Sequence, residues 1–353
     1  MARFGVDLTA AWRPRVGMVT LAVELTRALL GLAPSRSLVV FSSRERVPGL
    51  DGDYEAVFSP HRNELANKFL WLPPVEALSS LDAILYPFWP QPPIRRRGAP
   101  PAVLFVHDLA FRLRPDEVPW QQRAYLGTVL PPALRSAAAV LAPSLATADD
   151  LLAVFPLPGL EARLRVVGEG PTPLPPPGAL PPGLEPGFVL AVGTLEPRKN
   201  YDRLAAAHAA LAGAPPLVIA GRPGWTGDAP PGGPGVRLLG HVDDATLAAL
   251  YANASLLAFP SLYEGFGLPL LDAMSRGLPA LVGDRGALPE LAGEAALVVD
   301  PESIEAIAGG LRRLLAEAPL RRRLAAAGKK RAAGFSWAAT AQQVLDTLAA
   351  ISK

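Results

Sequence analysis

Two short stretches of this 353-residue sequence carry charged side chains directly after apolar runs. Arg198 and Lys199 follow one run, and Glu264 and Asp272 follow another. An adjacent arginine and lysine can neutralise a diphosphate. The planar guanidinium group donates paired hydrogen bonds, and the lysine ammonium group acts as a point charge. Ionised carboxylates accept hydrogen bonds from hydroxyl groups. The two stretches together predict a ligand with both phosphates and hydroxyls, as in a nucleotide-sugar.

The surroundings of Glu264 have the order strand, glycine-rich turn and helix start. Residues 256–259 are apolar and predict a buried parallel strand. The following helix starts near Leu268, has Pro269 in its first turn and ends at Gly277. Free N–H groups at a helix start favour anions, and glycines let the backbone approach a ligand, so this turn suits a phosphorylated molecule.

The sequence of this turn also carries a family resemblance. The run from Glu264 to Pro269 reads Glu-Gly-Phe-Gly-Leu-Pro, and an acid stands eight positions after Glu264. This pattern resembles the acid-seven-acid signature of retaining GT-B glycosyltransferases of the family 4 type, the glycosyl transferases group 1. The second acid is usually Glu in that family, so its ribose contact is expected to be shorter, rearranged or water-mediated here. The resemblance implies a catalytic Glu264, donor-sugar contacts at Gly265, Phe266 and Gly267, a diphosphate contact at Leu268, and ribose binding by Asp272.

Residues 193–200 read Gly-Thr-Leu-Glu-Pro-Arg-Lys-Asn. They resemble the diphosphate-binding motif of the same family, which implies that the two cations bind the donor diphosphate. Asn200 is expected to cap a helix over residues 201–211. A later loop supplies main-chain contacts to the nucleobase in the family, which places His241 and Val242 on the nucleobase side.

Two positions in the first half complete the predicted site. Gly17 precedes a predicted helix over residues 18–32, and the family's corresponding loop closes over the donor diphosphate; a simple turn explains one glycine equally well. His107 follows an apolar strand at residues 102–106, at the strand end where open α/β sheets place ligands. The run from His107 to Pro115 resembles the loop of mannosyltransferase-like members in which the histidine approaches the transferred sugar. His107 is therefore expected to be catalytic.

Composition excludes several other classes of protein. The formal net charge is only +2, which argues against a dedicated nucleic-acid binder. The chain has no cysteine, and its four histidines do not have metal-ligand spacing. No bound metal or cofactor is expected. The first residues lack the apolar core of a signal peptide, and no apolar run approaches the roughly 20 residues that span a bilayer. These features predict a cytoplasmic protein.

The length favours two domains. The predicted class is α/β, and the resemblance implies the GT-B architecture, with two Rossmann-like domains facing across a cleft. A helix is expected near residues 120–130, and another is expected to start at Asp300 and Pro301 and end near Ala316. The predicted domains are an N-terminal Rossmann-like acceptor-side domain (1–170), a Pro-rich linker (171–187), a C-terminal Rossmann-like nucleotide-sugar domain (188–334) and a terminal helix that crosses back to the N-terminal domain (335–353).

The resemblance implies a retaining glycosyltransferase that moves a hexose from a nucleoside-diphosphate sugar to a saccharide or lipid-linked acceptor. The loop at His107 favours mannose and a GDP-sugar. Two alternatives stay open: a non-catalytic nucleotide-sugar-binding protein, and a GT-B-type nucleotide-sugar epimerase. A dehydrogenase would need Gly-x-Gly-x-x-Gly after an early strand, and that run is missing.

Arg95, Arg96 and Arg97 form a basic run. A solvated charge run is its commonest explanation; the alternative is contact with anionic lipid headgroups, as in a peripheral membrane protein, or with a phosphorylated acceptor.

Overall fold

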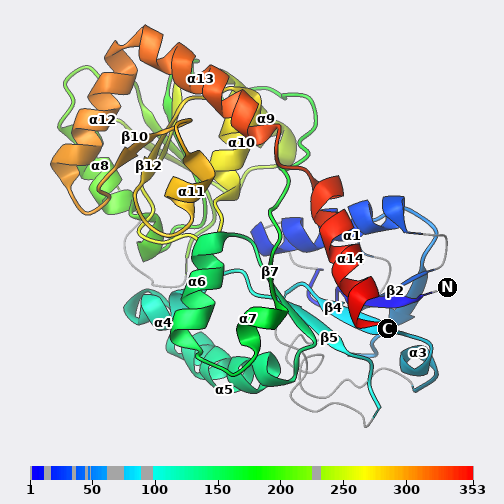
Figure 1. The fold of residues 1–353 in the computed structure, drawn as a ribbon. Coiled ribbons are helices and arrows are strands. Elements are labelled where there is room, and N and C mark those ends of the chain that lie inside the picture. The colour runs from blue at the N-terminus through cyan, green and yellow to red at the C-terminus, as the bar shows by residue number, and fades with distance from the viewer. Residues whose placement is uncertain are drawn as a thin grey trace. The chain divides into compact units, whose positions relative to one another are not determined.

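The computed structural model describes residues 2–11, 17–33, 37–43, 47, 49–61, 75–88, 98–224 and 232–352 (Figure 1). The basic run at Arg95, Arg96 and Arg97 and the loop before Gly17 lie outside these residues. The chain divides into two compact units. Unit 1 consists of Met1–Arg112, Gln121–Gly170 and Ser336–Lys353, and unit 2 of Leu113–Trp120 and Pro171–Phe335. In the part of the chain described, no helix has the length and apolar character needed to cross a membrane.

Unit 1 is built on a seven-stranded sheet with the order β3-β2-β1-β4-β5-β6-β7, and all its strand pairs are parallel. Parallel sheets are covered on both faces, so their strands are mostly apolar and buried, as β2, β4, β5 and β6 are. The elements are β1 (Phe4–Asp7), α1 (Gly17–Leu32), β2 (Leu38–Ser42), β3 (Glu55–Phe58), α3 (Val75–Ser79), β4 (Ala83–Tyr86), β5 (Ala102–Phe105), α4 (Ala110–Leu113), α5 (Trp120–Ser136), β6 (Ala139–Ala142), α6 (Leu145–Val154), α7 (Leu160–Arg163), β7 (Leu164–Val166) and α14 (Trp337–Ile351). The short helix η1 (Pro115–Glu117), between α4 and α5, belongs to unit 2.

Unit 2 is built on a six-stranded parallel sheet with the order β10-β9-β8-β11-β12-β13. Its elements are β8 (Val189–Val192), η2 (Pro197–Lys199), α8 (Tyr201–Ala209), β9 (Leu217–Ala220), β10 (Val236–Gly240), α9 (Asp244–Asn253), β11 (Leu256–Phe259), α10 (Leu268–Arg276), β12 (Ala280–Gly283), α11 (Leu288–Ala292), β13 (Leu297–Val299), α12 (Ile304–Ala316) and α13 (Ala318–Ala332).

Alternate residues of the central strands of unit 2 enter two hydrophobic cores. In β11, Leu257 and Phe259 pack on the side of α9, α10 and α11, while Leu256 and Ala258 pack on the side of α8 and α12. All four side chains are buried to 1% exposure or less. The strand is therefore fixed from both faces, and the turn that follows it is held at a defined position.

Two predicted helices have different bounds in the structure. α12 starts at Ile304 and not at Asp300, because the Ser303 side chain accepts a hydrogen bond from the Ala306 N–H and forms the N-cap. α5 does not end before its two prolines but continues to Ser136. The missing proline N–H groups are tolerated because residues on both sides of the prolines, among them Leu130 and Leu134, are buried in the core.

The proline-rich segment 171–187 contains no helix or strand, as its composition predicts. It is not a free spacer, however, because it packs on unit 2. Leu184 is buried, Leu174 and Leu180 lie against the same core, and the Gly178 N–H donates to the carbonyl oxygen of Ala245 at 3.0 Å. The segment is part of the surface of unit 2.

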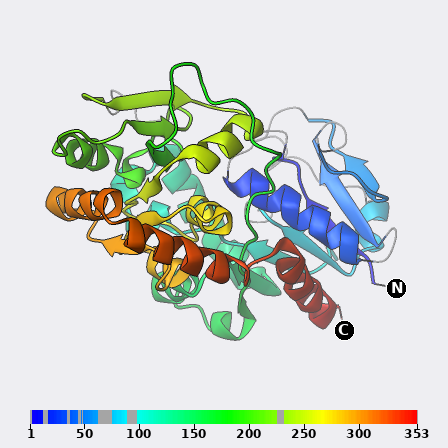
Figure 2. The same cartoon turned by 90° about the horizontal axis from the view of Figure 1, so that it is seen from above.

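The last helix, α14, belongs to the core of unit 1. Figure 2 shows it beside α1, against which it packs. Ala341, Val344 and Leu348 are fully buried in the unit 1 core. Gly170 lies so close to the start of α14 that a Cβ there would stand 2.5 Å from the Trp337 backbone nitrogen. Any larger residue at position 170 would displace the helix.

Replacing Leu348 by Ala is expected to lower the free energy of unfolding by about 2–4 kcal/mol, because it leaves a cavity in the unit 1 core. The exposed Gln343→Ala on the same helix is the control, with an expected change within about 0.5 kcal/mol. Urea unfolding followed by fluorescence measures both. Equal effects of the two variants would contradict the placement of α14 in this core.

Candidate functional site

The sheet of unit 2 has one point at which the strand order reverses. β8 and β11 are neighbours there, and the remaining strands follow outward on the two sides. Open α/β sheets bind ligands at the carboxyl ends of the strands beside such a point. Arg198 and Lys199 follow β8, and Glu264 follows β11. The topology of the sheet therefore brings the three predicted residues together.

Four charged side chains meet here and form a charge quartet: Glu196, Arg198, Lys199 and Glu264. Arg198 Nη1 lies 2.8 Å from Glu264 Oε2, and Lys199 Nζ lies 2.6 Å from Glu264 Oε1. Arg198 Nε lies 2.5 Å from Glu196 Oε1. Glu196, Lys199 and Glu264 are only 6%, 7% and 6% exposed. Two cations are thus matched by two anions, and the quartet has no formal net charge.

The quartet fixes the protonation of Glu264. Burial alone would raise the pKa of this carboxyl, but the charges of Lys199 and Arg198 and the hydrogen bond from Lys199 lower it to about 2. Burial, followed by the charge of Arg198, lowers the pKa of Lys199, whereas Glu264 and Glu196 oppose this shift. Glu264 is therefore an anion at neutral pH, which can attract cations and accept hydrogen bonds but has no proton to donate.

Main-chain contacts join the loops that carry the quartet. The Leu262 N–H donates to the carbonyl oxygen of Arg198 at 2.7 Å, and Arg198 Nη1 donates to the carbonyl oxygen of Tyr263 at 3.1 Å. Lys199 Nζ lies 4.9 Å from the centre of the Phe259 ring, a cation–π contact at the end of β11. The two loops are held as one piece before any ligand binds.

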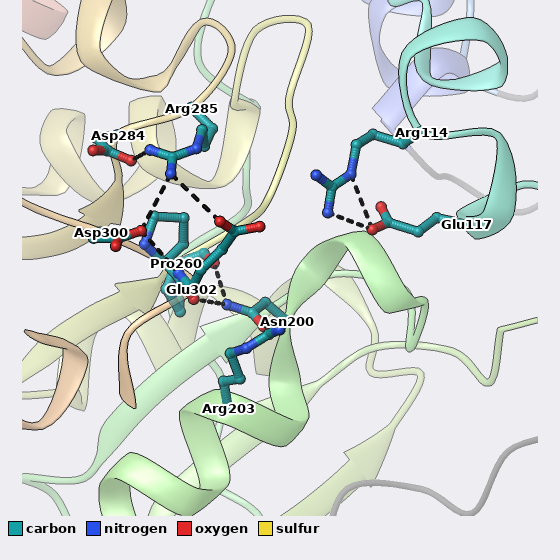
Figure 3. A network of polar contacts seen from close by, with 10 residues as sticks. Arg114, Glu117, Asn200, Arg203, Pro260, Asp284, Arg285, Asp300 and Glu302 are labelled. Carbon is teal, nitrogen blue, oxygen red and sulfur yellow. Dashed lines mark hydrogen bonds and ion pairs between the residues drawn. The ribbon is translucent and has the colours of Figure 1, made fainter. Parts of the chain in front are cut away.

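Asn200 does not cap α8 with its side chain, contrary to the sequence prediction. Its Nδ2 instead donates to the carbonyl oxygens of Pro260 at 3.0 Å and Pro301 at 2.6 Å (Figure 3). The residue has a left-handed backbone (φ 61°), which asparagine tolerates better than most side chains. Arg203 Nη1 donates to Asn200 Oδ1 at 3.0 Å. Asn200 thus ties together the turns that follow β8, β11 and β13.

A second arginine braces the neighbouring turns. Arg285, after β12, pairs with Asp284 and lies 3.2 Å from Asp300 Oδ1 and 3.7 Å from Glu302 Oε2, which both follow β13 (Figure 3). These side chains are 39% to 53% exposed, so the pairs contribute little to stability. Their effect is to position the turn whose Pro301 carbonyl receives Asn200.

The main chain of Glu264 is held by the turn that follows β12. The Ala287 N–H donates to the carbonyl oxygen of Glu264 at 2.9 Å. At Gly286, which has φ 58°, a Cβ would stand 2.5 Å from that same oxygen. Only glycine fits this approach. In the sequence, the glycine two residues after Asp284 is the feature that indicates this close approach.

The residues after Glu264 contribute through their backbone. The Phe266 side chain is buried in the core, where its ring lies edge-on to Phe335 at 5.9 Å, so a ligand can meet only its main chain. Gly267 caps α10 with φ 112°, and Leu268 is the first residue of that helix. Gly277 ends α10 in the left-handed conformation, as predicted. The first N–H groups of an α-helix have no partner in a preceding turn, and α10 begins four residues after Glu264.

Asp272 lies one turn into α10 and holds the segment that enters unit 2. Its Oδ1 accepts a hydrogen bond from the Thr172 N–H at 2.6 Å, and Arg276 Nη2 donates to the carbonyl oxygen of Thr172 at 2.9 Å. Asp272 is 4% exposed, and this burial raises its pKa to about 6 in spite of Arg276 and Thr172. The predicted ribose ligand is thus also an anchor for the proline-rich segment.

His107 and Gly17 belong to unit 1. The Nε2 atom of His107 lies 2.6 Å from the carbonyl oxygen of Pro87; since a carbonyl only accepts, Nε2 carries the hydrogen. Burial lowers the pKa of His107, so the ring is neutral and Nδ1 is an acceptor. Asp108 Oδ1 accepts from the Ala110 N–H at 3.0 Å at the start of α4. Gly17 is the exposed first residue of α1.

The predicted nucleobase-side loop follows β10. Val242 packs against the unit 2 core, and Asp243 caps α9 by accepting a hydrogen bond from the Thr246 N–H at 2.7 Å. His241 Nε2 lies 3.3 Å from Arg222 Nη2. Arg222 follows β9, and its carbonyl oxygen accepts from the Leu195 N–H at 2.8 Å. Sequence reasoning missed Arg222, which had no recognisable motif around it.

Known proteins are similar to this chain in sequence and in structure. Residues 179–331 match the family model "Glycosyl transferases group 1". The O-antigen chain mannosyltransferase B of Escherichia coli is 38% identical over 162 residues, which are 43% of this chain and 42% of that protein. The MMP alpha-(1->4)-mannosyltransferase of Mycolicibacterium hassiacum is 42% identical over 108 residues, 30% of this chain and 26% of that protein. The chain thus matches less than half the length of these relatives.

Solved structures are similar over almost the whole chain. A sucrose-phosphate synthase from Thermosynechococcus elongatus has a TM-score of 0.72 at 19% identity, covering 98% of both chains. Anabaena Alr3699/HepE in complex with UDP and glucose has a TM-score of 0.71 at 17% identity, covering 99% of this chain and 100% of its own. These likenesses confirm the predicted α/β fold of the GT-B class.

Replacing Glu264 by Gln should change the dependence of stability on pH. The folded pKa of about 2 lies below the ordinary value of 4.5. The carboxylate therefore contributes about 3 kcal/mol that is present above pH 4.5 and lost as the pH falls towards 2. Urea unfolding between about pH 3 and 7 should show this acid loss in the wild type and a smaller one in the variant. Glu294→Gln, at an exposed site, is the control; equal pH profiles for all three proteins would refute the buried quartet.

The ionisation of Asp272 should lower the stability of the fold, whereas that of Glu264 raises it. Its folded pKa of about 6 lies above the ordinary value of 3.8, so its ionisation costs stability as the pH rises through this interval. Asp272→Asn keeps an oxygen for the Thr172 N–H and removes the charge. Relative to the wild type, this variant should gain stability between about pH 4 and 6, as measured by urea unfolding. A constant difference across that range would contradict the raised pKa.

Proposed function

We propose that the protein is a retaining glycosyltransferase of the glycosyl transferases group 1 family, whose model matches residues 179–331. It moves a hexose from a nucleoside-diphosphate sugar to a saccharide or lipid-linked acceptor. One observation carries the proposal: Arg198, Lys199 and Glu264 meet at the reversal point of the unit 2 sheet, inside the matched residues. The two cations suit the diphosphate, and the carboxylate suits the sugar hydroxyls.

The neutral quartet supports a role in leaving-group stabilisation. When the bond between the sugar and the phosphate breaks, the departing diphosphate gains negative charge. Arg198 and Lys199 are already positioned by Glu264, so they need no rearrangement to meet that charge. Lys199 has three N–H groups, and its hydrogen bond to Glu264 uses one of them. The N–H groups near Leu268, at the start of α10, also stabilise the negative charge on the diphosphate. Gly17 is proposed to supply a further main-chain contact to it.

Glu264 is proposed to orient the sugar rather than to move a proton. As the sugar becomes oxocarbenium-like, an adjacent carboxylate stabilises it and accepts hydrogen bonds from its hydroxyls. In the proposed reaction the acceptor oxygen bonds to the anomeric carbon on the face that the phosphate leaves. The acceptor proton passes to the departing phosphate. No protein base is required, and neither a metal ion nor another cofactor enters the step.

The other predicted residues complete the proposed donor site. Neutral His107 offers its Nδ1 as an acceptor to a sugar hydroxyl, which the tautomer fixed by Pro87 supports. Gly265, Phe266 and Gly267 meet the sugar through their backbone. Asp272 is proposed to bind the ribose, and the main chain at His241 and Val242 faces the nucleobase.

The proposed donor is GDP-mannose. Curated relatives from Escherichia coli and Mycolicibacterium hassiacum are named mannosyltransferases, which supports the sugar. The choice of guanine as the nucleobase rests on the resemblance of the loop at His107 to mannosyltransferase-like members of the family. Structures of Anabaena Alr3699/HepE contain UDP or UDP-glucose, so a UDP-sugar is the alternative that an experiment must test.

Nucleotide release by the purified protein tests the proposal directly. UDP-, GDP- and ADP-sugars are supplied with a chelator present, and binding is followed in parallel as a melting shift. A ligand at about 100 times its dissociation constant adds about 2.7 kcal/mol to the free energy of unfolding. Release from one donor identifies base and sugar. Donor binding without release, even with saccharide and lipid-linked acceptors, would favour a nucleotide-sugar-binding protein, and absence of binding would refute the proposal.

Glu264→Gln and Lys199→Ala should each lower turnover by at least ~10²-fold, the size seen when one charge-stabilising group is removed. Both variants remove a charge that acts on the reacting groups. Glu294→Gln, an exposed change of the same chemistry, should leave turnover near that of the wild type. The comparison uses initial rates of nucleotide release at saturating donor. Near-normal turnover of folded Glu264→Gln would rule out the assigned role.

A further inference from the structure

The helix α13 has an unusually one-sided charge. Its 15 residues contain six basic side chains and no acidic one. The whole chain has 34 basic and 32 acidic residues, so the rest of the protein is net negative. A helix with this composition does not reflect the average charge of the protein and calls for a local explanation.

Two of the six basic residues have structural roles within unit 2. Arg321 Nη1 donates to the carbonyl oxygens of Leu314 at 2.6 Å and Leu315 at 2.7 Å, where α12 ends. Arg331 Nη2 donates to the carbonyl oxygen of Glu290 at 2.7 Å. These contacts account for Arg321 and Arg331 and leave four cations to be explained.

The remaining cations form an outward basic stripe, defined as Arg322, Arg323, Lys329 and Lys330. All four are exposed, although the side chain of Lys329 also lies against Gly277 at the end of α10. Positions seven apart lie on the same side of a helix, so Arg322 aligns with Lys329, and Arg323 with Lys330. Within the described ranges, no carboxylate forms an ion pair with any of the four; the nearest helix-end acid in sequence, Glu317, pairs with Arg313 at 3.3 Å.

The apolar side of α13 is already occupied. Leu320, Leu324, Gly328 and Ala332 are buried, and α13 packs against α10, with Gly328 facing Met274. The helix therefore has no apolar face left to insert into another molecule. Any partner of the basic stripe has to be held by charge.

We propose that the basic stripe of α13 docks unit 2 onto an anionic lipid bilayer. The stripe lies on the outer side of one straight helix and spans about 12 Å from Arg322 to Lys330 at 1.5 Å per residue. A planar array of lipid headgroups reaches all four cations at once, and each cation near such a surface adds attraction. A long polyanion such as a nucleic acid would also contact the rest of the chain. That remainder has a net negative charge and would repel it.

This inference goes beyond the proposed transfer reaction and does not depend on it. The basic run at Arg95, Arg96 and Arg97 had suggested a membrane contact from sequence alone, but those residues lie outside the described structure. The stripe on α13 rests instead on exposed side chains that pair with no carboxylate among the described residues. A lipid-linked acceptor, if the chain uses one, would be presented at the same surface.

The test is co-sedimentation of the full chain with vesicles, without donor or acceptor. Wild-type protein should bind phosphatidylcholine vesicles that contain about 30% phosphatidylglycerol at low salt, and binding should weaken at least tenfold near 0.5 M salt. It should not bind phosphatidylcholine alone. Arg323→Glu/Lys330→Glu should lose at least about tenfold in binding, and Arg323→Lys/Lys330→Arg should retain it.

A second charge-reversed double variant controls for net charge. Arg135→Glu/Arg165→Glu changes the net charge by the same amount at exposed positions of unit 1 and should bind as the wild type does. Melting curves confirm that each variant is folded. Equal loss in both charge-reversed variants, or binding of the wild type to neutral vesicles, would overturn the proposal. So would wild-type binding that survives reversal of the stripe, or selective binding to nucleic acid and not to vesicles.

Discussion

The ion-paired Glu264 is the interaction on which the rest of the candidate site depends. Burying Lys199 and most of Arg198 beside the sheet is costly unless anions accompany them. Glu264 supplies one anion from the loop after β11, and Glu196 supplies the other from the same loop as the cations. Asn200 and Gly286 then fix the backbones of these loops. The site is therefore a rigid piece of unit 2 whose charges are balanced before a ligand arrives.

Much of the fold was predictable because local signals agreed with the tertiary structure. β11 has the predicted bounds, since it is an apolar run with polar or turn residues on both sides. The end of α10 at Gly277 also follows from a single residue. These features depend on neighbours in the chain, which a sequence displays directly.

Other features depend on partners that are distant in the chain. Asn200 resembles a helix cap locally, but its amide is used by Pro260 and by Pro301, 60 and 101 residues away. Asp272 resembles a ligand-binding acid, yet it also holds Thr172, 100 residues earlier. The predicted site residues after β8 and β11 do meet, because the parallel sheet brings their strand ends together. Which cation pairs with which anion could not be read from spacing alone.

The placement of α14 has a consequence for synthesis on the ribosome. The unit 1 core includes Ala341, Val344 and Leu348, which are translated after all of unit 2. Unit 2 takes nearly all its residues from the continuous segment Pro171–Phe335. Domains generally fold as units during translation, with the N-terminal one first. Here the order of completion is reversed: the second unit has all its residues while the first still lacks part of its core.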